Sequence, residues 1–446
     1  MERGSFRTKI GVILATAGSA VGLGNVWRFP YMTGKDGGAA FIIIYLVAIL
    51  MLGIPGMVAE FVVGRNGASN AARAYTRAGG KAWGLVGYLG VFTSLIILGF
   101  YSVVAGWCLQ YLAVSLMGHI HGDVAYAAAY FRTFSSDPIE PLLWTVAFIL
   151  ITHFVVVRGV RRGIERVSNI LMPVLFILLL VIVVASCTLP NAGKGIEYLF
   201  KPNFSLVTRD VFLDALGQAF FSLSLGTACL CTYASYFSRQ TNLLKSAGQI
   251  AGIDTLVAIL AGLMIFPAAF AVGINPDSGP SLIFITLPTV FQQAFSPIPG
   301  YIVSVLFYAL LALAALTSTI SMHEIGTSMW FEELHISRSK GAIIETVAAI
   351  IVGIFCSLSC GAVDLTIAGK SILDFCDFLT SNVLLPIGSF LTCILVGWVA
   401  PRQMVRDQLT NWGTLGTVFY KIWLFLVRFI APVSIIVVFL HQLNIV

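Results

Sequence analysis

The sequence predicts an all-α integral membrane protein with eleven transmembrane helices: a 5+5 inverted repeat with broken helices 1 and 6, plus an eleventh helix. Three observations predict this fold. Of the 446 residues, 58% are hydrophobic and only 10% are charged, whereas soluble domains carry roughly 25% charged residues. The chain holds many long apolar segments, and a helix of about 20 apolar residues crosses the hydrocarbon core. Two of these segments lose their helical pattern midway.

The apolar segments give the eleven expected crossings in chain order: 10–33, 38–63, 83–117, 141–158, 166–187, 210–237, 243–272, 300–331, 341–358, 371–399 and 416–441. Each segment is too long and too uniformly apolar for a barrel strand, so each is expected to be a helix. No polar stretch is long enough for an appended soluble domain. The chain is therefore expected to form one domain over 1–446, built from a first five-helix repeat (10–187), a second, inverted one (210–399) and the eleventh helix (416–441).

The distribution of basic residues orients the expected helices. Of the 26 Lys and Arg residues, nineteen fall on one side of the crossings and seven on the other. The positive-inside rule therefore places the N-terminus in the cytoplasm, and an odd number of crossings places the C-terminus outside. The longer loops, 118–140, 188–209 and 273–299, then lie outside. The last contains five prolines and is expected to fold as a short bent lid.

Several other classes of function are disfavoured by composition. The net charge of +6 is modest, and no basic run suggests nucleic-acid binding. The eight cysteines form no CxxC pair and show no metal-ligand spacing with the six histidines. Most lie in apolar segments, where a thiol behaves as a small hydrophobic group. The charged N-terminus precedes a glycine-broken apolar stretch without a small-residue cleavage site, so no removable signal peptide is expected.

Two segments are poor helices at mid-span, one over 17–25 (AGSAVGLGN) and one over 222–228 (SLSLGTA). Glycine in a helix interior costs about 1 kcal/mol relative to alanine. Small residues also allow close helix packing in membranes, and that alternative remains open for each segment alone. However, the interruptions lie about 203 positions apart, each in the opening helix of a five-helix set. Such paired interruptions in inverted repeats predict a transporter site at the midplane, where freed carbonyls bind cations and freed N–H groups bind an anion.

Longer motifs point to a known family. Residues 18–30 (GSAVGLGNVWRFP) and 36–41 (DGGAAF) resemble the opening of the neurotransmitter:sodium symporter family. Residues 220–226 (FFSLSLG) resemble its broken sixth helix, and 314–318 (AALTS) its eighth. The match covers nearly the whole chain, and its eleven helices and short termini resemble the bacterial amino-acid transporter branch. The resemblance implies a multi-pass protein of the cell membrane, the bacterial inner membrane, embedded in the lipid bilayer.

The resemblance also implies two sodium sites built from oxygen ligands. The first would use the carbonyls of Ala20 and Ser222, the amide oxygen of Asn25, the hydroxyl of Ser222, the carboxylate of Asp254 and the substrate's own carboxylate. The second would use the carbonyls of Gly18, Val21 and Ala314 and the hydroxyls of Thr317 and Ser318. A plainer alternative is that the hydroxyls of 317–319 bond back to their own helix.

Asp254 lies within an apolar helix, where an acid costs a few kcal/mol and is by default a candidate functional group. Animal members of the family bind chloride beside a tyrosine, a glutamine and serines. Here Tyr45, Gln218 and Ser222 are present, but one expected position is Ala258. We hypothesise that Asp254 replaces chloride as the fixed negative charge, so no bound chloride is expected. The alternative is a structural acid paired with a neighbour.

The resemblance implies that the substrate is an α-amino acid. Its carboxylate would meet sodium, the N–H groups of Leu23 and Gly24 and the hydroxyl of Tyr101, and its ammonium would meet Ala20, Phe221, Ser224 and Leu225. Monoamine carriers of the family place an aspartate where this chain has Gly22, so the ligand here must bring its own carboxylate. The side-chain pocket would be lined by Ser19, Ile97, Tyr101, Phe221, Thr227, Thr319 and Met322. This lining carries no charge, which favours neutral, hydrophobic or aromatic substrates.

Paired charges imply gates on both sides. By resemblance, Arg28 and Asp377 form the outer gate, bridged by water above Tyr101 and Phe221. Arg3 and Glu332 form the inner gate, with Tyr236 nearby. Gly163 and Pro173 resemble the family motif whose unwinding opens a water path to the second sodium site. Of the remaining membrane acids, Glu60 could receive N–H groups freed in the sixth helix.

Together these features predict sodium-coupled symport of a neutral α-amino acid by alternating access. A sodium-gated channel or an amino-acid sensor on the same scaffold is the alternative, which concentrative uptake would exclude. An enzyme is not expected, because His323-Glu324 alone offers neither a nucleophile–base pair nor a metal cluster. The sequence leaves the oligomeric state open.

Overall fold

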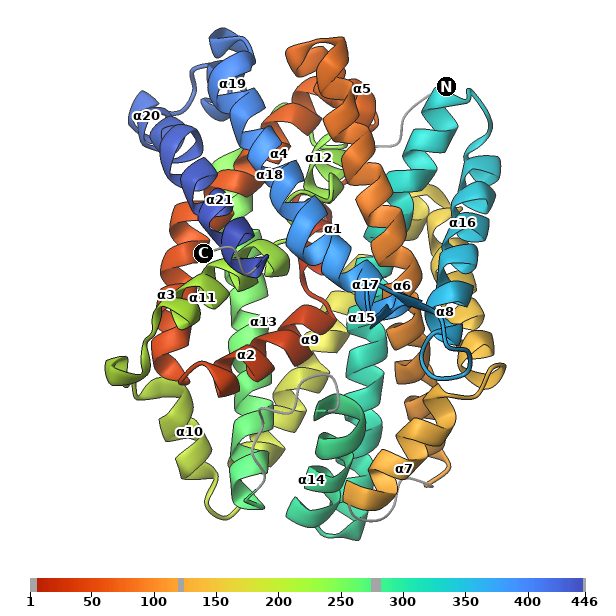
Figure 1. The fold of residues 1–446 in the computed structure, drawn as a ribbon. Helices are drawn as coiled ribbons and strands as arrows, with labels where there is room; N and C mark the ends of the chain where they lie inside the picture. The colour runs from red at the N-terminus through yellow and green to blue at the C-terminus, as the bar shows by residue number, and fades with distance from the viewer. Residues whose placement is uncertain (1–5, 119–123, 274–281, 444–446) are drawn as a thin grey trace.

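The computed structural model describes residues 6–118, 124–273 and 282–443, which form a helical bundle with one short hairpin (Figure 1). Among these residues, eight segments are long and apolar enough to cross a membrane: Ala39–Gly67, Lys81–Leu116, Val160–Cys187, Leu243–Ala271, Pro297–Glu333, Arg338–Leu358, Ile372–Val399 and Thr417–Gln442. Two bent pairs raise this number to ten if each is one span: Lys9–Ala20 with Gly24–Lys35, bent by 55°, and Val124–Ser135 with Glu140–Val156, bent by 75°.

Each of the eleven apolar segments contains helical structure. The elements before the second interruption are α1 (Lys9–Ala20), η1 (Gly24–Arg28), α2 (Phe29–Lys35), α3 (Ala39–Ala48), η2 (Ile49–Gly53), α4 (Ile54–Gly67), α5 (Ala71–Gly79), η3 (Lys81–Trp83), α6 (Gly84–Leu116), α7 (Val124–Ser135), α8 (Glu140–Val156), η4 (Val160–Glu165), α9 (Arg166–Cys187), α10 (Ala192–Phe200), η5 (Phe204–Leu206) and α11 (Arg209–Ser222). The elements after it are α12 (Cys229–Ala234), α13 (Leu243–Ala271), η6 (Leu282–Thr286), α14 (Leu287–Ala294), α15 (Pro297–Glu333), α16 (Arg338–Leu358), β1 (Thr366–Ile367), β2 (Lys370–Ser371), α17 (Ile372–Phe378), η7 (Leu379–Leu384), α18 (Leu385–Ile394), η8 (Leu395–Val399), α19 (Arg402–Leu409), α20 (Thr417–Phe425), η9 (Leu426–Ile430) and α21 (Ala431–Gln442).

Short helices cover the two ends of the bundle. In Figure 1, α5 and α19 lie at one end, and α7, α10 and α14 lie at the other. The three long loops of the sequence prediction therefore contain helices, because a short helix satisfies its own backbone hydrogen bonds outside the bilayer. The expected lid at 273–299 contains η6 and α14, while residues 274–281 lie outside the described residues. The antiparallel hairpin pairs Thr366 with Ser371.

The outer surface of the spans is apolar. Large side chains remain exposed on several spans, among them Leu50 (62%), Val184 (62%) and Phe419 (65%). Water-soluble proteins rarely expose continuous apolar surface on this scale. These faces are therefore suited to contact with lipid acyl chains.

The first expected interruption is confirmed. α1 ends at Ala20, Val21 has extended backbone angles (φ −68°, ψ 112°), and the π-helical η1 begins only at Gly24. The axis bends by 55° across this gap. The backbone of 21–23 is thus removed from regular helix in the middle of a membrane-spanning segment, as the glycine-rich pattern predicts.

The second expected interruption is confirmed as well. Between α11 and α12, the residues Ser224 (φ 53°), Gly226 (φ 83°) and Ala228 (φ 59°) all have left-handed backbones. This conformation costs about 1–2 kcal/mol for a residue with a side chain. At Gly226 a Cβ would also run into the carbonyl oxygen of Leu385 on α18, so glycine is required there. α1 and η1 pack against α13, and α1 also contacts α15, which sets the walls of the site.

Candidate functional site

A buried polar cluster joins the two interrupted spans to α13. The amide nitrogen Nδ2 of Asn25 donates to Asp254 Oδ1 at 2.7 Å and to the Asp254 carbonyl at 3.1 Å. The Ser222 hydroxyl, at the end of α11, donates to Asp254 Oδ2 at 2.6 Å. Tyr45 Oη lies 3.3 Å from Ser222 Oγ and 3.5 Å from Asp254 Oδ2. The side-chain groups predicted for the first sodium site therefore lie together, and Asp254 is fully buried.

The amide oxygen of Asn25 points back into the first interruption. It accepts a hydrogen bond of 3.0 Å from the N–H of Gly22, a donor freed where α1 ends. Both ends of the Asn25 amide are thus engaged, the nitrogen by Asp254 and the oxygen by the broken backbone. This one side chain links the interruption to the acid on α13.

The groups predicted for the second sodium site also lie together, between α1 and α15. The Val21 carbonyl accepts from Thr317 Oγ1 at 3.3 Å and from Ser318 Oγ at 3.2 Å. Thr317 Oγ1 also lies 2.9 Å from the Ala314 carbonyl, so it bonds within its helix as well as across to the break. A Cβ on Gly18 would lie 3.4 Å from Thr317 Cβ, so this residue faces the same site. Oxygen atoms of two helices thus converge where a hard cation could take the place of the hydroxyl-to-carbonyl hydrogen bonds.

Backbone, hydroxyl and glycine meet beside these oxygens. Tyr101 Oη on α6 accepts a 2.9 Å hydrogen bond from the N–H of Leu23. A Cβ on Gly22 would lie 2.5 Å from Ser318 Oγ and 2.8 Å from Tyr101 Oη. The Leu23 N–H and the Tyr101 hydroxyl, both predicted to bind a substrate carboxylate, are therefore adjacent. Any side chain at Gly22 would collide with Ser318 and Tyr101.

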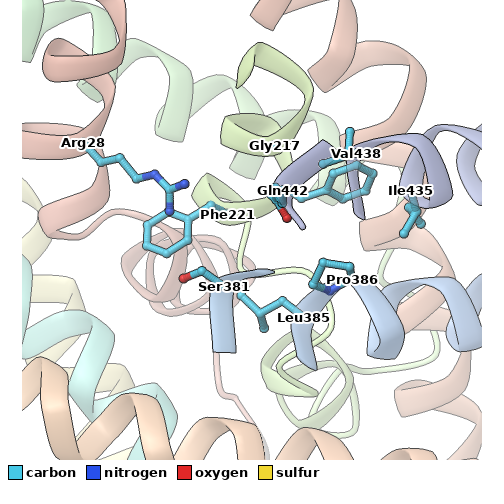
Figure 2. A pocket seen from close by; sticks show the side chains of 10 residues that line it. Arg28, Gly217, Phe221, Ser381, Leu385, Pro386, Ile435, Val438 and Gln442 are labelled. Carbon is cyan, nitrogen blue, oxygen red and sulfur yellow. The ribbon is translucent and has the colours of Figure 1, made fainter. Parts of the chain in front are cut away.

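Phe221 and Arg28 lie on the other side of the broken backbone. A Cβ on Gly24 would lie 2.9 Å from the Phe221 ring, and the Arg28 guanidinium carbon lies 4.2 Å from the centroid of that ring (Figure 2). Among the described residues, Arg28 makes no direct ion pair with Asp377, whose Oδ1 accepts from Ser381 at 3.1 Å. Of the two residues predicted for the outer gate, Arg28 thus makes a cation–π contact with Phe221.

The remaining residues predicted to contact substrate lie on several elements. Ser224 donates to the Ser19 carbonyl at 3.4 Å, while the hydroxyls of Ser19 and Thr227 bond to nearby backbone carbonyls. Thr319 lies 2.9 Å from Thr152 on α8, measured between hydroxyl oxygens. The other predicted residues are buried or half-buried and join the apolar core: Ala20, Ile97, Leu225 and Met322. Among the residues predicted to contact substrate, Thr319 thus directs its hydroxyl toward α8.

The residues predicted for the inner gate are only partly among the described residues. Arg3 lies outside the described residues. Glu332 accepts from the backbone N–H of Asn70 at 2.7 Å. Tyr236 donates to Glu324 at 2.6 Å, and Arg338 forms an ion pair with that carboxylate. Arg338 was not predicted as a functional residue. The signal in the sequence is that it begins the helix after α15, 14 residues after an acid within an apolar segment.

The start of the fifth expected helix is irregular and contacts the N-terminal segment. Gly163 lies in the π-helical η4 and Pro173 inside α9. Glu165, at the end of η4, accepts hydrogen bonds from the backbone N–H groups of Arg7 (2.8 Å) and Thr8 (3.1 Å). This acid was missed by the sequence analysis, although it is the only acid in the basic stretch 158–166.

Glu60 on α4 satisfies backbone donors of the second interruption, as the sequence analysis suggested. One carboxylate oxygen accepts from the N–H of Gly226 at 2.7 Å and the other from the N–H of Cys231 at 3.3 Å. Glu60 is 1% exposed. A buried carboxylate therefore replaces the helical acceptors that the break removes.

Comparisons with known proteins agree with this architecture. A model of the family described as "Sodium:neurotransmitter symporter family" matches residues 3–126 and 135–446. The uncharacterized sodium-dependent transporter YhdH of Bacillus subtilis (strain 168) is 39% identical over 444 residues, covering 98% of this chain and 97% of that protein. The human sodium- and chloride-dependent GABA transporter 2 is 25% identical over 469 residues, covering 92% and 75%. The crystal structure of MhsT in complex with L-phenylalanine matches with a TM-score of 0.90 and 40% identity, covering 99% of this chain and 100% of that one.

The role of Glu60 can be tested by removing its side chain. Glu60→Ala removes the carboxylate that accepts from the buried N–H groups of Gly226 and Cys231, and an unsatisfied buried donor costs about 1–3 kcal/mol. We expect a lower melting temperature in detergent, measured by thermal denaturation. Glu197→Ala is the control, because that acid is exposed and its ion pair is with exposed Lys201. Equal melting temperatures for both variants would contradict the capping role.

Proposed function

This chain belongs to the sodium:neurotransmitter symporter family, and we propose that it couples Na⁺ entry to the uptake of a neutral, hydrophobic or aromatic α-amino acid by alternating access. The observation that carries the proposal is the cluster of Asn25, Ser222 and Asp254 between two interrupted spans. Broken helices at mid-membrane are the usual place for coupling-ion and substrate sites in secondary transporters.

We assign sodium to two positions. The first takes oxygen ligands from Ala20, Asn25, Ser222 and Asp254, and the second from Gly18, Val21, Ala314, Thr317 and Ser318. Support comes from the short distances among these groups and from their burial, since a bare cation in this low-dielectric interior needs closely spaced oxygens. Because the first site borders the interruption at Gly22, a substrate carboxylate there completes the sodium ligands, which couples the two bindings.

The proposed substrate class follows from what the site offers. The N–H groups of the first interruption and Tyr101 Oη are donors suited to a carboxylate. Gly22 supplies no carboxylate of its own, so the ligand must carry one. The proposed pocket lining of Ser19, Ile97, Thr227, Thr319 and Met322 has no charge, and L-phenylalanine is the ligand named with the MhsT structure.

Gating follows from contacts that can form and break in each cycle. On the outer side, Arg28 lies over the ring of Phe221 (Figure 2), and we propose that it pairs with Asp377 when the gate closes. On the inner side, we assign Arg3 and Glu332 to a gate, with Tyr236 bound to the neighbouring acid Glu324. Ligands shift such an equilibrium only by binding one state more tightly than the other, and sodium bound between α1 and α15 favours the closed interior.

The proposal includes an arrangement in the bilayer. Eleven crossings comprise two inverted sets of five, 10–187 and 210–399, followed by 416–441. The N-terminus is cytoplasmic and the C-terminus external, in the inner membrane of a bacterium. The excess of basic residues at the end that holds α5 and α19 supports this orientation.

The proposed function predicts concentrative uptake. Purified protein in liposomes is supplied with each of the twenty radiolabelled amino acids, with an inward Na⁺ gradient or with K⁺ in its place. We expect accumulation of neutral hydrophobic or aromatic amino acids only with the gradient, and none of lysine or glutamate. Equilibration without accumulation indicates a channel, and binding without uptake indicates a sensor; either result contradicts the proposal.

The substrate pose predicts that Gly22→Asp abolishes uptake. The new side chain would enter the space between Ser318 and Tyr101 and place a fixed carboxylate where the substrate's own must bind. Uptake and sodium-dependent ligand binding are both measured. Gly193→Asp is the matched control, since that position on α10 is exposed with nothing within 4 Å of a Cβ, and it should transport normally. Normal uptake by Gly22→Asp would refute the pose.

The proposed role of Asp254 as fixed negative charge predicts independence from chloride. We expect uptake by the unmodified chain to be unchanged when external chloride is replaced by gluconate. Asp254→Asn keeps the size of the side chain but loses its charge, so uptake should fall by at least about tenfold, a loss of more than about 1.4 kcal/mol, and recover in part with chloride. Abolition of uptake by gluconate in the unmodified chain would exclude this role.

A further inference from the structure

Three cysteines gather where α16 ends and α17 begins. Cys356 is fully buried near the end of α16, Cys360 lies in the turn that follows, and Cys376 is half-buried on α17. The Sγ atoms of Cys356 and Cys376 are 4.0 Å apart. The Cys360 thiol instead faces the Cys356 carbonyl at 3.3 Å. Of the three, Cys356 and Cys376 thus have thiols in direct contact across two helices.

We propose that Cys356 and Cys376 form a redox modification site, in which a reversible disulfide fixes the outer end of α17 against α16. The two helices pack against each other here. The Ser359 hydroxyl already ties the turn after α16 to the N–H of Leu373 at 3.2 Å. A small side-chain rotation can therefore bring the sulfur atoms to bonding distance without separating the helices.

The position of the pair favours oxidation. With the orientation proposed above, this end of α16 faces the outside, where disulfides persist, whereas the cytoplasm keeps thiols reduced. Cys376 is the accessible partner and Cys356 the sheltered one. That division suits an attacking thiol and a resolving thiol, respectively.

The reaction needs an oxidant, which we name as a low-molecular-weight disulfide. The Cys376 thiolate attacks one sulfur of that disulfide, the S–S bond breaks, and one small thiol leaves with the proton that Cys376 gave up. Cys356, as thiolate, then attacks the Cys376 sulfur and releases the second small thiol, which takes the proton from Cys356. Two protein thiols are oxidised, and one small disulfide is reduced to two thiols.

The consequence concerns the outer gate. Asp377 follows Cys376 directly in α17, and α17 packs against α6, the helix that carries Tyr101. A covalent link at Cys376 therefore restrains the acid proposed for the gate and the helix that must move past it. Oxidation should hold this end of the transporter in one conformation.

The test uses the full chain in liposomes, reduced or treated with external oxidised glutathione. Peptides are analysed by mass spectrometry without reduction. Hydrogen exchange is followed over 372–384, and sodium-driven uptake is measured with L-phenylalanine as the probe. We expect a Cys356–Cys376 link, exchange over 372–384 slowed by about tenfold, and slower uptake. Dithiothreitol should reverse all three changes.

Matched variants separate this site from general thiol damage. Cys356→Ser and Cys376→Ser should lose the link and the slowed exchange. Cys360→Ser and Cys187→Ser should keep both. Cys187 is a matched control, because it is half-buried like Cys376 but lies at the end of α9 and not on α16 or α17. Absence of the link, a link between Cys360 and Cys376, or a link that leaves exchange unchanged would overturn the proposal. Because the link and the exchange are read without transport, failure of L-phenylalanine uptake in the reduced protein counts against the proposed function alone.

Discussion

Backbone polar groups inside a membrane must find partners within the protein, and the rest of this structure depends on that constraint. Each interruption frees several N–H and C=O groups at a depth where water does not replace them. Asn25 accepts from one freed donor at Gly22, and Glu60 accepts from Gly226 and Cys231. The buried acids of this bundle are therefore part of the architecture as much as of the chemistry. An apolar side chain at Glu60 would leave the second break without its acceptors.

The two ends of the bundle are held by interactions of different strength. Toward the proposed cytoplasmic side, a buried carboxylate binds Tyr236 and Arg338 together, and Glu165 fastens the segment before α1. Toward the other side, Arg28 lies on an aromatic ring and no direct pair with Asp377 is formed among the described residues. Ion pairs with little exposure are costly to break, whereas a cation–π contact is worth about 0.5–2 kcal/mol, depending on how far it is desolvated.

The sequence predicted the structure best where the membrane limits which residues a helix tolerates. Glycine-rich interruptions in long apolar segments predicted both breaks, and the acid inside an apolar segment predicted that Asp254 would need polar partners. The contacts of Arg338 and Glu165 were not predicted. Arg338 lies on the helix after the one that carries Glu324, and Glu165 lies in a basic stretch and contacts Arg7, which is distant in the sequence. The helices α7, α10 and α14 were expected as loops, since the search for 20-residue apolar spans passes over short surface helices. Tyr236 was expected near the gate of Arg3 and Glu332, and its hydroxyl donates to Glu324, two turns before Glu332 on α15.

The hydroxyls of Thr317 and Ser318 both point at the carbonyl of Val21. A hydroxyl can rotate, offering either its proton or its lone pairs to the same neighbour. At the proposed second sodium site, the two O–H groups can turn away from a bound cation and present their oxygen lone pairs to it. When the cation is absent, they can turn back and donate to the carbonyl, which reduces the electrostatic repulsion among the oxygens. Rotation about single bonds can thus adapt this proposed site to a bound or a released cation, within the larger helix movements of the proposed transport cycle.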